Sequence, residues 1–269
     1  MTTAVEYPAG APCWMDLSVP DLDLARRFYG GVLGWEFDDL PYSMARLNGR
    51  RVAGLSQRWG PDPEAEAARS AAWTVYLATQ SLAGTLEAVT NAGGRPLGVP
   101  QDIGDLGAMA IARDPAGAVF GMWEPGTLRG AEAYGEPGAP VWSEVTSGDV
   151  EAASAFLVRV FGYEPERLAG YDFVTLYSGG TPVCGVYGGT ADRPSRGLAA
   201  WLTYFAVRSA DDAAALAQDS GGTVVDPPAD SPFGRRCLLA DPFGARFAAV
   251  EPAERSGPAG PTAPPPAPR

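Results

Sequence analysis

Two acidic residues, each placed two positions after a tryptophan, have the clearest potential for chemistry in this sequence. Asp16 follows Trp14, and Glu144 follows Trp142. If both segments are strands, alternation places each carboxyl group on the same face as its tryptophan. A carboxyl group buried beside an indole ring has a raised pKa and can serve as a general acid or base. An indole face can also stack on a flat ligand.

Purely structural roles are open for the same residues. Trp14 and Trp142 could be core residues, because large aromatic side chains commonly fill protein interiors. Asp16 and Glu144 could be solvated carboxyl groups at the mouth of a cavity. Cys13 is a candidate nucleophile, but strand alternation turns it away from Trp14, and the sequence contains no histidine to activate a thiol.

The composition excludes several classes of partner. The net charge of −12 disfavours nucleic acid, since binding a phosphate backbone needs a basic patch. No apolar run approaches the roughly 20 residues that a membrane span requires. The N-terminal sequence MTTAVEYPAG lacks the pattern of a secretory signal, and the three cysteines are widely spaced without a CxxC motif. We therefore expect a cytoplasmic protein with reduced thiols.

An internal repeat divides the chain into two similar halves. PCWMDLSVPDLDLARRFYGGVLGWE matches PVWSEVTSGDVEAASAFLVRVFGYE at an offset of 128 residues, and ARDPAGAVFGMWEP matches LADPFGARFAAVEP at an offset of 127. Such self-similarity predicts two homologous domains, over residues 8–126 and 136–252. The Pro/Ala-rich tail over residues 253–269 cannot bury apolar surface and is expected to be disordered.

Each half has the same order of predicted elements. In the first half a strand over residues 14–19 precedes a helix that begins after Asp21 and ends at Gly34. A hairpin at Asn48-Gly49 follows, and the second half has Ser178-Gly179-Gly180 in its place. Another strand, helix and further strands complete the half, with an Asp-Pro-x-Gly turn before the last strand. The sequence thus predicts an α+β fold in which strand–helix–strand–strand–strand occurs twice in each half.

This pattern resembles the vicinal oxygen chelate superfamily, which includes glyoxalase I, extradiol dioxygenases and bleomycin-binding proteins. The resemblance covers residues 11–252 and is carried by VPDLDLARRFYGGVLGW, SGDVEAASAFLVRVFGYE and the two Asp-Pro-x-Gly turns. It implies two fused glyoxalase-like domains, each built of paired βαβββ modules whose mixed sheet curls around a cavity. It also implies that a pseudo-dimer forms within one chain, so the protein is either a monomer or a homodimer.

The resemblance also implies where a metal ion would bind. The metal-ligand positions of the superfamily fall on six residues of this sequence: Trp14, Thr74, Gly121, Trp142, Leu202 and Ala248. Apart from the weakly binding threonine, their side chains cannot hold a divalent cation. One carboxyl group per half is also a poor cage for a hard cation, which needs several converging oxygens. We therefore expect no metal and no other cofactor.

Apolar and aromatic residues at the ligand positions should line each cavity with large rings. The candidate ligand-binding residues are Trp14, Thr74, Tyr76, Val119, Gly121 and Trp123 in the first half, and Trp142, Leu202, Tyr204, Arg246 and Ala248 in the second. This set favours a metal-independent protein that binds a small planar or aromatic molecule, for sequestration or in antibiotic resistance or biosynthesis. The alternative is a metal-independent isomerase, cyclase or hydrolase with Asp16 or Glu144 as general acid or base. A metal-dependent glyoxalase or dioxygenase is a third reading, which the six positions disfavour.

Overall fold

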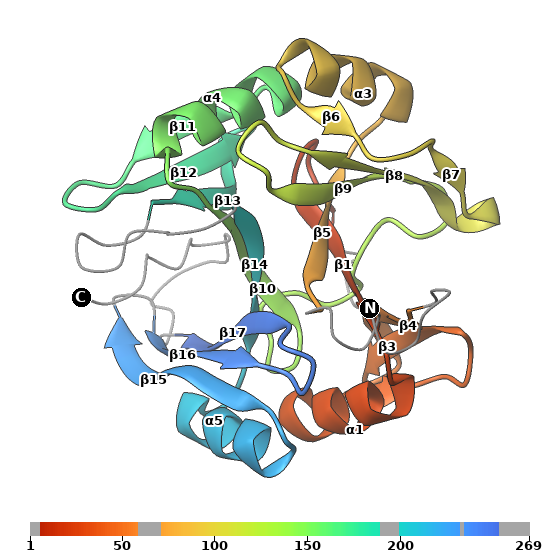
Figure 1. Cartoon of the computed structure of the whole chain (residues 1–269), viewed down its shortest axis with the longest axis vertical. Helices are drawn as coiled ribbons and strands as arrows, with labels where there is room; N and C mark the ends of the chain where they lie inside the picture. Colours follow the sequence, from red (N-terminus) through yellow and green to blue (C-terminus); the bar gives the residue numbers. More distant parts are fainter. Residues whose placement is uncertain (1–5, 59–70, 189–198, 232–233, 253–269) are drawn as a thin grey trace.

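The computed structural model describes residues 6–58, 71–188, 199–231 and 234–252. The tail over residues 253–269, expected to be disordered, lies outside this range. The described residues form two mixed sheets with helices against them (Figure 1), as the predicted α+β class requires. No described helix has the length and apolar character needed to cross a membrane.

The first half contains two βαβββ modules. The first module comprises β1 (Pro12–Val19), α1 (Leu22–Leu33), β2 (Glu36–Phe37), β3 (Tyr42–Leu47) and β4 (Arg50–Gln57). The second comprises β5 (Trp73–Ala78), α3 (Leu82–Asn91), β6 (Arg95–Pro96), β7 (Gln101–Asp102), a 3-10 turn at Gly104–Leu106, β8 (Gly107–Arg113) and β9 (Val119–Pro125). Antiparallel pairing of β1 with β5 joins the modules into one sheet of order β2-β3-β4-β1-β5-β9-β8-β6, with β7 beside β8.

The second half repeats this arrangement. Its modules comprise β10 (Pro140–Thr146), α4 (Val150–Phe161), β11 (Glu164–Arg167), β12 (Phe173–Ser178) and β13 (Thr181–Tyr187), then β14 (Ala200–Ala206), α5 (Ala210–Asp219), β15 (Thr223–Ser231), β16 (Gly234–Ala240) and β17 (Arg246–Pro252). The strand order β11-β12-β13-β10-β14-β17-β16-β15 matches that of the first half. The tandem arrangement expected from the repeat is therefore confirmed.

Local sequence signals begin and end the helices as expected. Asp21 Oδ1 accepts a hydrogen bond from the backbone N–H of Leu24 at 2.9 Å, and α1 ends at Gly34 with φ of 73°. Asp149 and Gly162 do the same for α4. A side-chain oxygen at the N-cap satisfies a free N–H of the first turn, and glycine accepts the left-handed backbone that ends the helix.

The hydrophobic cores combine elements of both halves. One core packs α1 against α5 and the strands β16 and β17, and the other packs α3 against α4. Both helix pairs are visible as neighbours on opposite sides of the molecule (Figure 1). Phe28 of α1 lies edge-on to Phe247 of β17, with ring centroids 6.2 Å apart. Tyr29 also donates a hydrogen bond to the buried Asp241 carboxylate of the second half at 3.1 Å.

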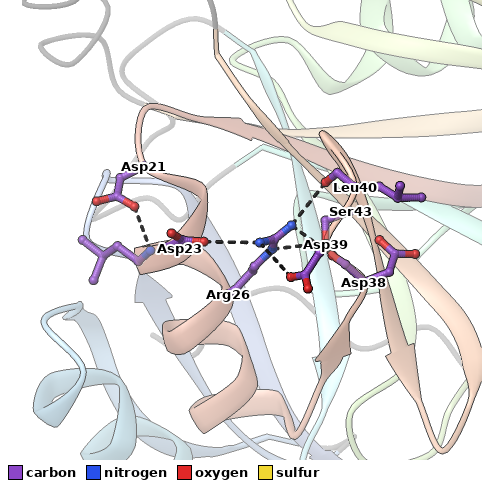
Figure 2. Close-up of polar contacts among 8 residues, drawn as sticks. Asp21, Asp23, Arg26, Asp38, Asp39, Leu40 and Ser43 are labelled. Atoms are coloured by element: carbon purple, nitrogen blue, oxygen red, sulfur yellow. Dashed lines mark hydrogen bonds and ion pairs between the residues drawn. The ribbon is translucent and has the colours of Figure 1, made fainter.

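Arg26 of α1 fixes the segment that leads into β3. Its guanidinium donates to the carbonyl oxygens of Asp38 and Leu40 and to the Ser43 hydroxyl (Figure 2). Asp23, in the same helix, accepts a further hydrogen bond at 3.2 Å. Because the guanidinium presents several donors in one rigid plane, a single side chain holds the whole turn. This turn carries Tyr42, the first residue of β3.

Candidate functional site

Strand register brings the predicted residues of the first half onto one face of its sheet. Asp16 of β1 lies opposite Thr74 of β5, and Trp14 lies opposite Tyr76. Tyr76 in turn lies beside Gly121 of β9. This face, which we call the inner face, is opposite the one that carries Met15 and Leu17 into the core with α1, as alternation predicts.

A chain of hydrogen bonds connects the polar groups of the first inner face. The Trp14 indole N–H donates to the Tyr42 hydroxyl at 2.9 Å, and that hydroxyl lies 3.4 Å from Asp16 Oδ2. The Tyr76 hydroxyl donates to the same carboxylate oxygen at 2.9 Å. Burial raises the pKa of Asp16 to about 6, although hydrogen bonds from Tyr76, Tyr42 and Thr74 oppose this rise.

Glycines allow the two tyrosine rings to lie close to the sheet. A Cβ atom at Gly121 would overlap the ring of Tyr76, and one at Gly54 would overlap the hydroxyl end of Tyr42. Gly121 stands at a position where the resemblance places a metal ligand. The space next to it is occupied by an aromatic ring, which accounts for a residue without a side chain at this position.

The inner face of the second half has the same arrangement of Trp142, Glu144 and Tyr204. Trp142 lies opposite Tyr204, and Glu144 lies opposite Leu202. The Tyr204 hydroxyl donates to Glu144 Oε1 at 2.8 Å. Burial raises the pKa of Glu144 to about 7, against the opposing effects of the Tyr204 hydrogen bond, the charge of Arg236 and the Trp142 indole, which lies near the carboxyl group without meeting hydrogen-bond geometry. The chain thus places two carboxyl groups of raised pKa, one on each inner face.

Three buried polar atoms of the second inner face have no hydrogen-bond partner within the described ranges. They are Trp142 Nε1, Glu144 Oε2 and Arg236 Nε. Trp142, Glu144 and Arg236 are only 1%, 2% and 6% exposed, so solvent does not satisfy these groups from outside. Buried polar atoms are usually paired, and an unpaired one costs free energy.

Comparison with known proteins agrees with this geometry. The sequence model of the "Glyoxalase/Bleomycin resistance protein/Dioxygenase superfamily" matches residues 13–122 and 141–249. The chain belongs to this superfamily. Its two matched segments correspond to the two sheets described above, so the expected fold and family are confirmed.

Relatives of this superfamily member extend over nearly its whole length. The anthracycline biosynthesis protein DnrV of Streptomyces peucetius is 35% identical over 265 residues, covering 91% of this chain and 94% of DnrV. CFP32 of Mycobacterium tuberculosis (strain CDC 1551 / Oshkosh), a glyoxylase by name, is 36% identical over 260 residues, covering 92% of this chain and 97% of CFP32. The Mn(II)-bound glyoxalase from Novosphingobium aromaticivorans superposes with a TM-score of 0.63 at 15% identity, covering 93% of this chain and 84% of that one, and this likeness concerns the fold alone.

The described side chains of the two inner faces do not provide a set of converging metal ligands. No group of three His, Cys, Asp or Glu side chains converges among the residues that the structure describes. The full sequence contains no histidine. Asp16 and Glu144 belong to different sheets, and each is surrounded by aromatic and hydroxyl groups instead of further carboxylates.

Some predicted residues of the superfamily member lie at the margin of the inner faces. Arg246 is exposed at the start of β17, and Val119 is partly buried at the start of β9. Trp123 is buried, but its indole N–H donates to the carbonyl oxygen of Leu128 in the linker at 2.7 Å. The indole N–H of Trp123 is therefore already paired within the protein.

Cys13 does not lie where alternation was expected to place it. It belongs to the same buried cluster as Trp14 and Tyr76, because a bulge between Pro12 and Trp14 interrupts the alternation. Burial raises the pKa of its thiol well above the usual value. A thiol of raised pKa is a poor nucleophile, so the Cys13 side chain has a packing role.

Four residues of the inner faces were missed by sequence reasoning: Tyr42, Met109, Phe173 and Arg236. Met109 lies 3.5 Å from the Tyr76 hydroxyl through its sulfur, and Arg236 influences the pKa of Glu144. All four residues lie outside the repeated sequence segments, so the motif spacing does not give their registers. Aligning the two hairpins on their glycines would have indicated Tyr42 and Phe173.

Proposed function

We propose that this protein binds a small planar or aromatic molecule on its inner faces and does so without a metal ion. The observation that carries the proposal is an indole at a metal-ligand position of the superfamily on each inner face, next to a tyrosine and a buried carboxyl group that are hydrogen-bonded to each other. Aromatic rings offer flat apolar surface, and the carboxyl group offers one specific polar contact. The names of DnrV and of DauV of Streptomyces sp. (strain C5), both anthracycline biosynthesis proteins, are consistent with a planar aromatic ligand.

We also propose that the protein works as a monomer. The packing of α1 against α5 and of α3 against α4 joins the two halves through shared hydrophobic cores. All three cysteines are buried as free thiols, which fits a reducing cytoplasmic environment. Gel filtration with light scattering tests the first point, with a homodimer as the contrary result.

A second candidate is a metal-independent isomerase, cyclase or hydrolase. It is favoured by the two carboxyl groups whose pKa values burial raises to about 6 and about 7, the range in which a group can both give and take a proton near neutral pH. Asp16 or Glu144 would then act as general acid or base on a ligand bound at the same face.

A thermal-shift screen of planar aromatic compounds tests the binding proposal. A ligand that binds only the folded chain must raise the melting temperature, and the rise should be unchanged after extensive treatment with EDTA. Elemental analysis of untagged protein should find less than about a tenth of an equivalent of metal. Loss of binding on chelation, restored by one metal, would reject metal independence.

Product analysis separates binding from catalysis. A ligand recovered unchanged after long incubation supports sequestration. Turnover that survives EDTA and is lost in Asp16→Asn or Glu144→Gln supports the enzyme instead. An inactive Asp16→Asn with an active Glu144→Gln would place the reaction on the first inner face, and the reverse result would place it on the second.

A further inference from the structure

Register shows that Tyr42 and Phe173 occupy the same position in the two halves. Tyr42 lies opposite Ser56 in the β3–β4 hairpin, and Phe173 lies opposite Tyr187 in the β12–β13 hairpin. In each half, the residue two positions further along the strand is paired with a glycine, which is Gly54 in the first half and Gly185 in the second. A Cβ atom at Gly54 would overlap Tyr42, and one at Gly185 would overlap the Phe173 ring. The two rings therefore cover equivalent parts of their sheets.

The missing hydroxyl explains why the Trp142 indole nitrogen on the second inner face is unpaired. In the first half the Tyr42 hydroxyl accepts from the Trp14 indole and lies against Asp16. Phe173 has no such group. Accordingly Trp142 Nε1, the counterpart of the Trp14 indole nitrogen, has no partner among the described residues. Glu144 Oε2 is unpaired as well, while Oε1 accepts from Tyr204 as Asp16 Oδ2 accepts from Tyr76.

A second difference between the two halves places a cation on the second inner face. Met109 of β8 lies opposite Trp123, and Arg236 of β16 lies opposite Val250, which are equivalent registers. The first half thus has a thioether where the second half has a guanidinium. Arg236 is 6% exposed, and its Nε also has no partner in the described part of the chain. The charge of Arg236 acts on both Glu144 and Tyr204, so the cation is near both groups.

We propose that the second inner face recognises the polar edge of the ligand, while the first is closed by its own hydrogen bonds. The ligand would present an oxygen acceptor to Trp142 Nε1 and Arg236 Nε and a hydroxyl group to Glu144 Oε2. A planar aromatic ring with a carbonyl oxygen next to a hydroxyl group has this pattern. The inference rests on the proposed function. It specifies the chemical class of the ligand and the half of the molecule that binds the ligand's polar edge.

The test compares 1,4-dihydroxyanthraquinone with unsubstituted anthraquinone, by quenching of tryptophan fluorescence. Wild-type protein should bind one dihydroxy compound per chain and bind anthraquinone about tenfold or more weakly, since anthraquinone keeps the carbonyl acceptor but has no hydroxyl group to pair with Glu144 Oε2. Phe173→Tyr supplies the missing hydroxyl, and Arg236→Met supplies the residue of the first half. Each should weaken dihydroxyanthraquinone binding about tenfold. Phe37→Tyr, the same exchange at a ring packed against the core, is the control and should bind like wild type.

Melting temperature without ligand provides a second readout. Phe173→Tyr should raise it, because the new hydroxyl gives the buried Trp142 indole N–H an acceptor. A raised melting temperature with unchanged dihydroxyanthraquinone binding would mean that water alone meets these atoms, and would overturn the inference while leaving the proposed function intact. Equal binding of both anthraquinones by wild type would overturn it as well. Binding of neither compound would count against the proposed function itself.

Discussion

The Tyr42 hydroxyl connects an indole donor to a carboxylate acceptor on the first inner face. Tyr42→Phe removes that connection and leaves the Trp14 N–H without its partner. We expect the free energy of unfolding to fall by about 1–3 kcal/mol, the cost of a buried unpaired donor. Urea denaturation followed by fluorescence measures the change.

Tyr171→Phe is the matched control for Tyr42→Phe. Both side chains are partly exposed, but the Tyr171 hydroxyl makes no hydrogen bond to a described residue, so its loss should change the stability little. An equal loss of stability in both variants would show that the Tyr42 hydroxyl has no special role.

Glu144 makes the stability of the protein depend on pH. Burial raises its pKa from 4.5 to about 7, so between these values the folded chain holds a proton that the unfolded chain releases. The stability from this group is therefore complete below about pH 4.5 and lost as the pH rises to about 7. Glu144→Gln cannot ionise, and it should gain roughly 2–3 kcal/mol relative to wild type between pH 4.5 and pH 8.

Chemical denaturation at several pH values measures this difference. Glu87→Gln, on the exposed face of α3, is the control and should follow wild type across the range. A constant difference between Glu144→Gln and wild type at all pH values would contradict a raised pKa.

At the residue scale, the sequence predicted which side chains share a face of the sheet but not which of them are hydrogen-bonded to each other. Alternation within one strand places Trp14 with Asp16 and Trp142 with Glu144, and this needs no knowledge of neighbouring strands. The roles of Tyr42 and Arg236 depend on strand pairing across the sheet. Strand pairing is set by register and turn length, which motif spacing does not contain.

At the scale of elements, Arg26 is the link between α1 and the turn before β3. Arg26→Gln removes the donors to the Asp38 and Leu40 carbonyl groups and the Ser43 hydroxyl. Hydrogen exchange over residues 38–47 should become faster by about tenfold, corresponding to roughly 1–2 kcal/mol of local stability. Exchange in α4 should not change.

Arg27→Gln tests whether this effect is specific. Arg27 neighbours Arg26 in the same helix but its side chain is exposed. If both variants increased exchange over residues 38–47 equally, loss of charge on α1 would be the cause instead of the lost hydrogen bonds.

Helices and turns of this chain were easier to predict than its short strands. Capping residues and the Asn48-Gly49 turn, with φ of 50° and 80°, act locally and so are visible in the sequence. The second hairpin differs from expectation in one detail. Ser178 is paired in β12 opposite Thr181, so the turn has two glycines and not three residues. Two-residue strands such as β2 depend on their neighbours and leave no periodic signal.

At the scale of the whole molecule, the two halves depend on each other for their cores. Phe28 of α1 is fully buried and packs against Phe247 of the second half. Phe28→Ala should lower the free energy of unfolding by about 3–5 kcal/mol. Because the core is shared, the chain should still unfold in one transition, which calorimetry can measure. Leu216→Ala, at a side chain that is 43% exposed, should have a much smaller effect.

Two separate transitions in Phe28→Ala would show that the halves fold independently.

The repeat in the sequence predicts two similar halves, and it does not reveal that α1 packs on α5 instead of on a helix of its own half. Contacts of this kind link residues more than 180 positions apart, as Phe28 and Phe247 are. Local patterns carry no information about them.

The covalent duplication has a consequence for how ligand preference can change. In a symmetric assembly of identical subunits, every substitution appears in both binding faces at once. In this chain each face is encoded separately, so exchanging a residue such as Phe173 or Arg236 alters one face and leaves the other as it was. Mutations can therefore change the ligand specificity of one face while the hydrogen bonds of the other sheet stay intact.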